Sequence, residues 1–387
     1  MSKKLKGNLR ILDINNLYSP AGGGIRVYHH QKMKWCRQNG IENFLAYPAS
    51  ADTRTEVSGG TAIGIKSPKL AGSGYYFFTN KTKLQNLIRE LKPDIIELGS
   101  GIVVPDMVKE FTGGIPTFAY YHSNWPEALP LSVLGIGKGP IPVLFKRLAS
   151  PKMVRGYKLL KTVFAASDYS LSKLREAGLS NIKKVPLGAD PITFHPDRRS
   201  EQLRKDLGAV NGKKIALYMG RLAPEKGISV LLKAFRHLFQ DENIIIVAAG
   251  GGHCKRKLQK AASAHPDKLK LISRINTRDQ AAELMASADA FISAGPCETF
   301  SLATLEALDC GTPVVACREA AAAELVHQAE GNSTYAPWDS GEALADAIIK
   351  AINTPREKRR QFRDFAEQFT WNRCFTTITE SCMQHLN

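Results

Sequence analysis

Short apolar runs alternate with amphipathic stretches along the chain, and this alternation constrains the fold more than any other feature of the sequence. Residues 9–15 and 116–121 have the composition and length of buried strands. Residues 25–38 and 83–91 instead have the period of amphipathic helices. Strands that alternate with helices of this length predict an α/β fold built on doubly wound parallel sheets.

The alternation occurs twice, because residues 188–197 are rich in turn formers and lack any periodicity. It restarts with a strand at 215–219, continues to a strand at 313–316 and is followed by three predicted helices. Two such runs predict two Rossmann-like domains, over residues 1–190 and 191–371. Ligands of these sheets bind beyond the carboxyl ends of the strands, so we expect the site in a cleft between the domains.

The composition excludes several other classes of protein. A 43% share of hydrophobic residues and a mean hydropathy of −0.21 argue against global disorder. The most apolar long stretch, residues 129–145, is interrupted by Lys138 and by prolines and is shorter than the ~18 residues of a spanning helix. No signal-peptide pattern is present, and the seven cysteines include no C-x-x-C pair. We therefore expect a cytoplasmic protein whose thiols are reduced and packed in the core.

The net charge of +17 is distributed unevenly. Residues 1–195 carry 27 Lys/Arg and 13 Asp/Glu, a net charge of +14, whereas residues 196–387 carry only +3. This asymmetry suggests that the first half meets an anionic partner: nucleic acid, a membrane surface or a phosphorylated substrate. The alternative is a solvated basic surface without a partner.

Glycines and cations follow the first strand of each half. Gly22, Gly23 and Gly24 precede the first helix, where glycine lets the backbone approach a phosphate, although an ordinary glycine turn explains them equally well. In the second half, residues 220–227 place Arg221 and Lys226 near a helix N-terminus. Such a pair suits a diphosphate, because cations at this end of a helix oppose its dipole and need another reason to be there. The alternative is two surface cations.

Two glutamates near a later helix form the sharpest feature. Glu298 lies at the tip of a loop, and Glu306 follows eight residues later on or near a buried helix. Carboxylates can accept paired hydrogen bonds from the vicinal hydroxyls of sugars and riboses. The amides of Phe300, Ser301 and Leu302 at the helix start can hold a phosphate. The alternative is a pair of ordinary surface glutamates, which would suit Glu306 better than Glu298.

These motifs together resemble the retaining glycosyltransferases of the GT-B fold, family 4, also called glycosyl transferases group 1. The resemblance covers nearly the whole chain and is more specific in the second half, as expected if the first half binds the variable acceptor. It implies two facing Rossmann-like domains, with the C-terminal helix, residues 372–387, crossing back to the first. The residues that carry it are Gly-Arg-Leu-Ala-Pro-Glu-Lys-Gly at 220–227, the E-x7-E pair Glu298 and Glu306, Gly-Thr-Pro-Val-Val-Ala at 311–316, and the linker at 185–190 with Phe194-His-Pro196.

The resemblance also implies roles for single residues of the second half. Arg221 and Lys226 would hold the donor diphosphate and stabilise its charge as the glycosidic bond breaks. Glu298 would contact hydroxyls of the donor sugar, and Glu306 would bind the ribose.

Further implied roles fall on other loops. Gly23 and Gly24 would approach the diphosphate from the first domain, and His122 matches the family's active-site histidine near the sugar. A lone histidine is commonly structural, but His122 ends a predicted strand in a polar cluster. Arg274 and Ile275 would frame the nucleotide base.

The chain departs from the family in one loop and lacks one motif of other transferases. Thr299 and Ser301 stand where the family often has glycine, which leaves the identity of the sugar open. No Asp-x-Asp occurs in the sequence, so the metal-diphosphate clamp of other transferases has no candidate ligands. We therefore expect no metal and no cofactor, with the leaving nucleotide neutralised by Arg221, Lys226 and helix amides.

Residues 129–161 mix apolar and basic side chains in a pattern that can lie on an anionic membrane. The expected enzyme transfers a hexosyl group from a UDP- or GDP-sugar to a membrane lipid or lipid-linked glycan, peripherally on the inner face of the membrane. The alternatives are a buried helix with a basic outer face, a soluble acceptor, or a GT-B epimerase or phosphorylase. No recognised RNA-binding or zinc pattern supports nucleic-acid binding.

Overall fold

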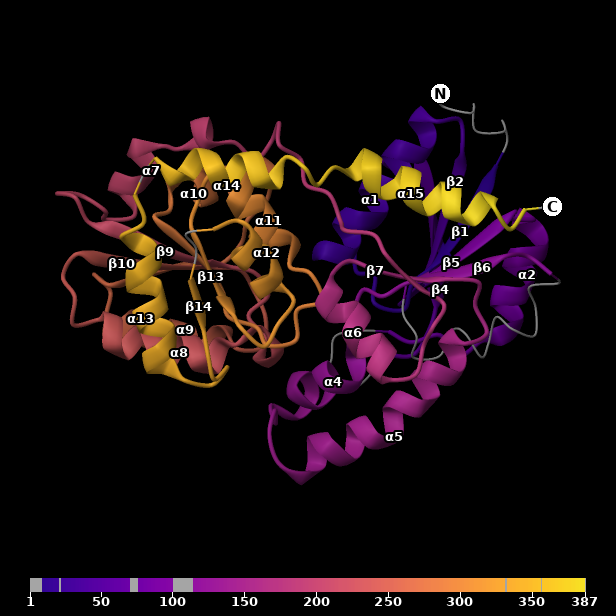
Figure 1. The fold of residues 1–387 in the computed structure, drawn as a ribbon, viewed down its shortest axis with the longest axis horizontal. Helices are drawn as coiled ribbons and strands as arrows, with labels where there is room; N and C mark the ends of the chain where they lie inside the picture. The colour runs from indigo at the N-terminus through magenta and orange to yellow at the C-terminus, as the bar shows by residue number, and fades with distance from the viewer. Residues whose placement is uncertain are drawn as a thin grey trace. The chain divides into compact units, whose positions relative to one another are not determined.

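The computed structural model describes residues 9–20, 22–69, 76–99, 114–330, 333–355 and 357–386. The first eight residues, where the sequence predicts no export signal, lie outside the described part. The chain divides into two compact units, Met1–Leu187 with Trp371–Asn387 (unit 1) and Gly188–Thr370 (unit 2) (Figure 1). The divisions fall after Leu187 and Thr370, where the sequence predicted them after Asp190 and Trp371.

Unit 1 contains an eight-stranded sheet in the order β3-β4-β2-β1-β5-β6-β7-β8. All neighbouring strands are parallel except β3, which runs antiparallel to β4 at the edge. The first strand, β1, lies between β2 and β5, so the direction of winding reverses between β1 and β5. The strands are β1 (Arg10–Ile14), β2 (Glu42–Ala49), β3 (Thr53–Val57), β4 (Gly60–Lys66), β5 (Ile95–Leu98), β6 (Thr117–Tyr120), β7 (Val163–Ala165) and β8 (Ile182–Lys184).

The helices of unit 1 include the last helix of the chain. This helix, α15 (Trp371–Met383), lies beside α1, and the Trp35 indole N–H donates to Asn372 Oδ1 at 2.9 Å (Figure 1). The C-terminal helix therefore belongs to the first domain, as the resemblance implied. The other described helices are α1 (Gly24–Gln38), α2 (Lys81–Leu91), α4 (Trp125–Leu134), α5 (Pro140–Tyr157) and α6 (Asp168–Glu176).

Unit 2 contains a parallel sheet of six strands in the order β11-β10-β9-β12-β13-β14. Every residue of β10 is buried, as expected for a parallel strand covered by helices on both faces. The winding reverses between β9 and β12. The strands are β9 (Lys214–Met219), β10 (Ile244–Ala249), β11 (Leu269–Ile272), β12 (Ala290–Ser293), β13 (Val314–Cys317) and β14 (Ser333–Tyr335).

Within the described residues, eight α-helices and two short 3-10 turns belong to unit 2. Their ranges are η1 (Pro196–Arg198), α7 (Glu201–Asp206), η2 (Pro224–Lys226), α8 (Ile228–Leu238), α9 (Lys255–Ala264), α10 (Arg278–Ser287), α11 (Leu302–Asp309), α12 (Ala322–Gln328), α13 (Gly341–Ile352) and α14 (Lys358–Ala366). The α/β class and the two parallel, Rossmann-like sheets confirm the predicted fold class.

Four elements differ from the prediction. β3 was not predicted, because its residues are mostly exposed and show no apolar alternation. β14 was not predicted either, because it has only three residues. α4 was not predicted as a helix; Pro126 lies in its first turn, where proline is tolerated, whereas Pro130 lies inside it. The short helix α7, which follows the predicted turn-rich segment 188–197, was not predicted either. The prediction of three closing helices was wrong, since α12, α13, α14 and α15 follow β13.

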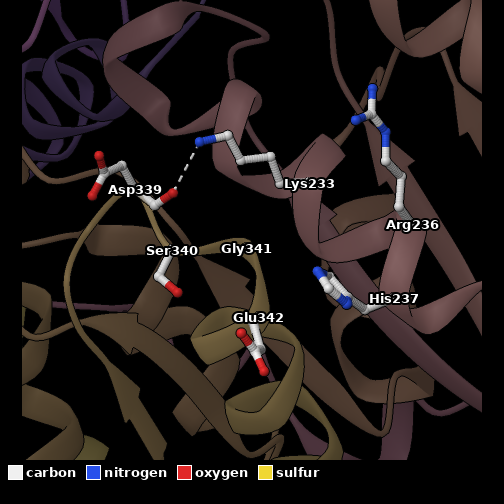
Figure 2. A pocket seen from close by; sticks show the side chains of 7 residues that line it. All are labelled: Lys233, Arg236, His237, Asp339, Ser340, Gly341 and Glu342. Carbon is white, nitrogen blue, oxygen red and sulfur yellow. Dashed lines mark hydrogen bonds between the residues drawn. The ribbon is translucent and has the colours of Figure 1, made fainter.

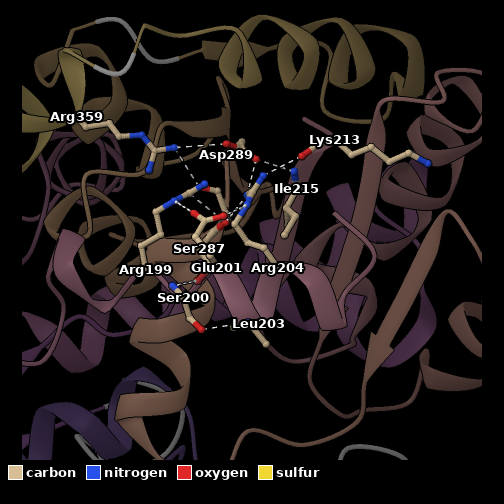
Figure 3. A network of polar contacts seen from close by, with 11 residues as sticks. Arg199, Ser200, Glu201, Leu203, Arg204, Lys213, Ile215, Ser287, Asp289 and Arg359 are labelled. Carbon is tan, nitrogen blue, oxygen red and sulfur yellow. Dashed lines mark hydrogen bonds and ion pairs between the residues drawn. The ribbon is translucent and has the colours of Figure 1, made fainter. Parts of the chain in front are cut away.

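A buried ion-pair network joins α7 to the amino ends of two strands in unit 2. Figure 3 shows Arg204 and Arg359 directed toward Asp289, the residue before β12. Arg204 Nη1 lies 2.8 Å from Asp289 Oδ2, and the Ile215 amide at the start of β9 donates to the same oxygen at 2.9 Å. Arg204 also donates to the Ser287 carbonyl at 2.7 Å. This network holds the edge of the sheet opposite to the carboxyl ends of the strands.

Candidate functional site

The loops that follow β9, β10 and β12 pack closely at the carboxyl edge of the unit 2 sheet. A Cβ atom on Gly227 would lie 2.4 Å from the Ala294 carbonyl oxygen, and one on Gly250 would lie 1.9 Å from the Gly220 carbonyl oxygen. Both glycines have positive φ angles, of 78° and 140°. Only glycine permits this approach, which brings the predicted motifs together where the winding of the sheet reverses.

Lys226 and Glu298 form an ion pair across this reversal point. Lys226 ends η2 in the loop after β9, and Glu298 lies in the loop after β12. Lys226 Nζ lies 2.7 Å from Glu298 Oε1, with 31% and 18% of the two side chains exposed. Two residues that the sequence separates by 72 positions are therefore in direct contact. The pair remains accessible enough to meet a ligand.

Arg221 is held on the same loop by its own carboxylate partner. Arg221 Nη2 lies 2.8 Å from Oε1 of Glu225, whose side chain is buried, whereas 45% of the arginine side chain is exposed. The Tyr218 hydroxyl donates to the Arg221 carbonyl at 2.8 Å and fixes the backbone. The two predicted cations thus lie on one ordered loop, each with a glutamate beside it.

The start of α11 carries a strained residue. Ser301, the N-cap, has φ 71°, in the left-handed region that favours glycine. Its hydroxyl oxygen accepts from Thr304 Oγ1 at 2.9 Å and lies 3.3 Å from Ser293 Oγ. The side chains of Phe300 and Leu302 are buried. The first intrahelical hydrogen bond is donated by the Thr304 amide to the Ser301 carbonyl. The amides before Thr304 therefore lie in the first turn of α11, and the first turn is where helices bind anions.

Glu306 lies inward on α11 and pairs with a residue that the sequence analysis missed. Its Oε1 lies 3.0 Å from Arg278 Nη2, and the Arg278 guanidinium is 4.7 Å from the centre of the Phe194 ring. Burial raises the pKa of Glu306 from 4.5 to about 7, although Arg278 opposes the shift. No signal in the sequence singled out Arg278, because it only begins a predicted helix.

Arg274 and Ile275 lie on the loop after the edge strand β11. Arg274 is exposed and Ile275 is half-buried. The Gly250 amide donates to the Ile272 carbonyl at 2.8 Å, so this loop adjoins the one after β10. Their expected role at the nucleotide base stays a prediction.

In unit 1, α1 connects the other predicted residues. Gly23 is the N-cap of α1 with φ 98°, and Gly24 is its first residue. One turn later, the Tyr28 ring packs against the His122 ring with centroids 4.6 Å apart. His122 follows β6, and burial together with the nearby His29 and Lys32 lowers its pKa well below the usual range. Its imidazole is therefore neutral near pH 7.

The sequence analysis also missed a buried polar cluster at the carboxyl ends of β1 and β5. Its members are Asp13, Tyr28, His29, Lys32 and Glu97, all of which are almost fully buried. A signal for it existed: Asp13 and Glu97 each lie in a short apolar run of the sequence, where a buried carboxylate needs a partner.

One pocket of about 480 Å³ lies elsewhere in unit 2, between α8 and the start of α13 (Figure 2). It is lined by Lys233, Arg236, His237, Asp339, Ser340, Gly341 and Glu342. None of the predicted site residues lines this pocket. Lys233 donates to the Asp339 carbonyl at 3.2 Å, which links the two sides of the pocket.

Comparison with known proteins gives two family matches. The family described as Glycosyl transferases group 1 matches residues 199–369, and Glycosyltransferase Family 4 matches residues 22–192. The chain is 28% identical over 377 residues, 96% of this chain and 95% of the other, to a GDP-mannose-dependent alpha-(1-6)-phosphatidylinositol dimannoside mannosyltransferase of Mycobacterium tuberculosis. It is 29% identical over 279 residues, 70% of this chain and 62% of the other, to a GDP-mannose-dependent alpha-mannosyltransferase of Corynebacterium glutamicum.

Solved structures share the fold. A sucrose-phosphate synthase from Thermosynechococcus elongatus superposes with a TM-score of 0.79 at 17% identity, over 97% of this chain and 98% of the other. Anabaena HepE in complex with UDP-glucose superposes with a TM-score of 0.74 at 19% identity, over 97% of this chain and all of the other. At these identities the likeness concerns the fold alone.

Proposed function

We propose that this chain, which belongs to the family 4 and group 1 glycosyltransferases, moves a hexosyl group from a nucleoside-diphosphate sugar to a membrane lipid or lipid-linked acceptor. Unit 2 binds the donor, and unit 1 binds the acceptor. The observation that carries the proposal is the Lys226–Glu298 pair, which puts a cation beside a hydroxyl-binding carboxylate where the sheet reverses its winding. A donor sugar diphosphate needs the cation for its phosphates and the carboxylate for its sugar hydroxyls.

The donor diphosphate lies against Arg221, Lys226 and the first amides of α11 in this proposal. On binding, the phosphate oxygens take over the cations from Glu225 and Glu298, which frees the Glu298 carboxylate to accept hydrogen bonds from sugar hydroxyls. The cations then stabilise the negative charge on the leaving nucleotide. Because the sequence has no Asp-x-Asp clamp, the reaction proceeds without a metal in the proposal.

The transfer retains the anomeric configuration. The acceptor hydroxyl attacks the face from which the nucleotide departs, and a donor phosphate oxygen accepts the hydroxyl proton. His122, Gly23 and Gly24 of unit 1 contribute at the sugar and the diphosphate. Arg274, Ile275 and Glu306 contact the nucleoside, which carries uracil or guanine.

The affinity for a nucleoside diphosphate is expected to rise about tenfold from pH 6 to pH 8, because Glu306 ionises across this range. The ionised carboxylate accepts hydrogen bonds from ribose hydroxyls, whereas the protonated form accepts fewer. Isothermal titration calorimetry with GDP and UDP at several pH values measures the change. The Glu306→Gln variant corrects for titration of the phosphates, and an equal pH dependence in both proteins would contradict the prediction.

The acceptor side of the proposal is supported by α5, at the periphery of unit 1 beside α4 (Figure 1). Ile141, Leu144 and Leu148 recur at helical spacing and are exposed by 52%, 58% and 64%. Val143 beside them is exposed by 67%. An exposed apolar stripe of this kind is unusual on a protein surface that faces only water.

Basic side chains continue the same surface of α5. Lys152 and Arg155 follow Leu148 at four and seven positions, which places them along the apolar stripe. An apolar stripe next to exposed cations suits the interface of an anionic lipid layer, where each cation contributes about 1 kcal/mol. Among the described residues, no helix is long and apolar enough to cross a membrane. In this proposal, the enzyme acts peripherally on the inner face of the membrane, with the apolar and basic surface of α5 against the lipid.

The Leu144→Asp/Leu148→Asp double variant is expected to bind anionic vesicles at least about tenfold more weakly, because two apolar side chains no longer enter the lipid. Co-sedimentation with phosphatidylglycerol vesicles measures this. Ile349→Asp, which alters an exposed apolar residue of α13, is the matched control and keeps wild-type binding. The membrane proposal would be contradicted if both variants bound the vesicles equally well, or if the binding did not weaken as the salt concentration rises.

The function itself is tested by incubating the protein with GDP-mannose or UDP-glucose and phosphatidylinositol mannosides or total membrane lipids. Transfer of labelled sugar to the lipid fraction, with release of nucleoside diphosphate, supports the proposal. Nucleotide release without labelled lipid, but with a labelled water-soluble product, would replace the lipid by a soluble acceptor. A sugar converted without transfer would instead indicate an epimerase or phosphorylase.

A further inference from the structure

Three charged side chains are buried together in unit 1, although buried ion pairs contribute little net stability relative to apolar packing. Lys32 Nζ of α1 lies 2.6 Å from Asp13 Oδ1 of β1 and 2.9 Å from Glu97 Oε2 of β5. At most 2% of each residue is exposed. β1 and β5 flank the point where the sheet reverses its winding, so the cluster lies beneath the edge where ligands of such sheets bind.

One side of the cluster fixes the turn after β1. Asn15 Oδ1 accepts from the Leu17 amide at 2.8 Å, which directs Asn15 Nδ2 toward His29 Nε2 at 2.9 Å. An amide nitrogen only donates, so Nε2 accepts and the His29 proton is on Nδ1, 3.3 Å from Asp13 Oδ2. A Cβ atom on Gly99 would lie 1.9 Å from Asn15 Nδ2, which shows how closely this turn is packed.

The other side of the cluster holds Tyr28 against His122. The Tyr28 hydroxyl donates to Glu97 Oε1 at 2.8 Å, and its ring meets the His122 ring nearly edge-on at 72°. The Tyr120 ring lies 4.7 Å from the His122 ring. Two tyrosine rings therefore restrict the imidazole, and the hydroxyl bond to the buried carboxylate keeps Tyr28 from rotating.

We propose that Tyr28 is a positioning residue for sugar transfer: Glu97, itself held by Lys32, anchors the tyrosine hydroxyl, and the tyrosine ring orients His122. The inference rests on the proposed function, in which His122 contributes at the donor sugar. Tyr28 itself touches no substrate. This positioning role explains why α1, β1 and β5 carry buried charged groups at a place where apolar side chains would pack equally well.

The test compares Tyr28→Leu, Tyr28→Phe and the control Phe164→Leu, which removes another fully buried ring of unit 1 that contacts Phe118. Tyr28→Leu is expected to lower kcat by about tenfold or more at a donor KM near the wild-type value, since misplacing a reacting group acts on the chemical step. Tyr28→Phe keeps the ring but loses the hydroxyl bond to Glu97, so its kcat should lie between those of Tyr28→Leu and the wild type. Phe164→Leu lowers the melting temperature but leaves kcat unchanged.

An NMR measurement makes the test independent of activity. The Hε1 resonance of His122, assigned by its loss in His122→Gln, is shifted by the Tyr28 ring current and should move in Tyr28→Leu but not in Phe164→Leu. An unmoved resonance, or equal kcat losses in Tyr28→Leu and Phe164→Leu, overturns the inference. If the wild type transfers no sugar, the proposed function fails, while the resonance still reports whether Tyr28 positions His122.

Discussion

Replacing Lys226 with alanine is expected to lower kcat/KM for sugar transfer by about 10²–10³-fold. Enzymes lose activity by a similar factor when one preorganised hydrogen-bond donor that stabilises transition-state charge is removed. Lys226 lies 2.7 Å from Glu298 and is partly exposed, so its ammonium group can reach a diphosphate. The alanine variant loses the charge that stabilises the leaving nucleotide and also leaves Glu298 without its ion-pair partner. Initial rates of nucleotide release at varied donor concentration measure the effect.

Two further variants separate these contributions. Lys233→Ala removes a lysine of the same unit outside the site and should keep wild-type kinetics. Glu298→Gln, alone and combined with Lys226→Ala, completes a double-mutant cycle that isolates the coupling between the two side chains. A Lys226→Ala enzyme within about tenfold of the wild type would remove the central support for donor binding at this loop.

Asp289→Ala is expected to lower the free energy of unfolding by about 3–5 kcal/mol, the range found when one partner of a buried ion pair is removed. Asp289 is 3% exposed and accepts from Arg204 at 2.8 Å and from the Ile215 amide at 2.9 Å. Without the carboxylate, the buried Arg204 guanidinium keeps its bonds to carbonyl oxygens and the longer 3.8 Å ion pair with Glu201, and the Ile215 amide loses an acceptor. Urea unfolding followed by circular dichroism measures the loss.

The control for Asp289 is an exposed ion pair of the same unit. Arg360 and Asp364 on α14 lie 4.0 Å apart with both side chains largely exposed. Asp364→Ala should therefore change the unfolding free energy by less than about 0.5 kcal/mol. Similar stabilities of the Asp289→Ala and Asp364→Ala variants would show that the network in Figure 3 does not hold α7 to the sheet.

Local sequence patterns predicted the α/β class and most elements, because apolar periodicity depends on residues a few positions apart. The predicted helices at 25–38 and 83–91 end where α1 and α2 end, and they begin one and two residues later. The patterns failed where an element depends on its neighbours. The exposed strand β3 exists because it pairs with β4, and nothing in its own residues indicates a strand.

The sequence by itself determined which chemical groups follow the strands: the cations of residues 220–227, the two glutamates of the E-x7-E motif and His122. Only the tertiary structure decided how these groups pair. It joined Lys226 to Glu298, placed Arg278 against Glu306 and buried Asp13, Lys32 and Glu97 together. The physical reason is range: periodicity reports on each segment alone, whereas ion pairs and burial arise when distant segments meet at the edge of a sheet.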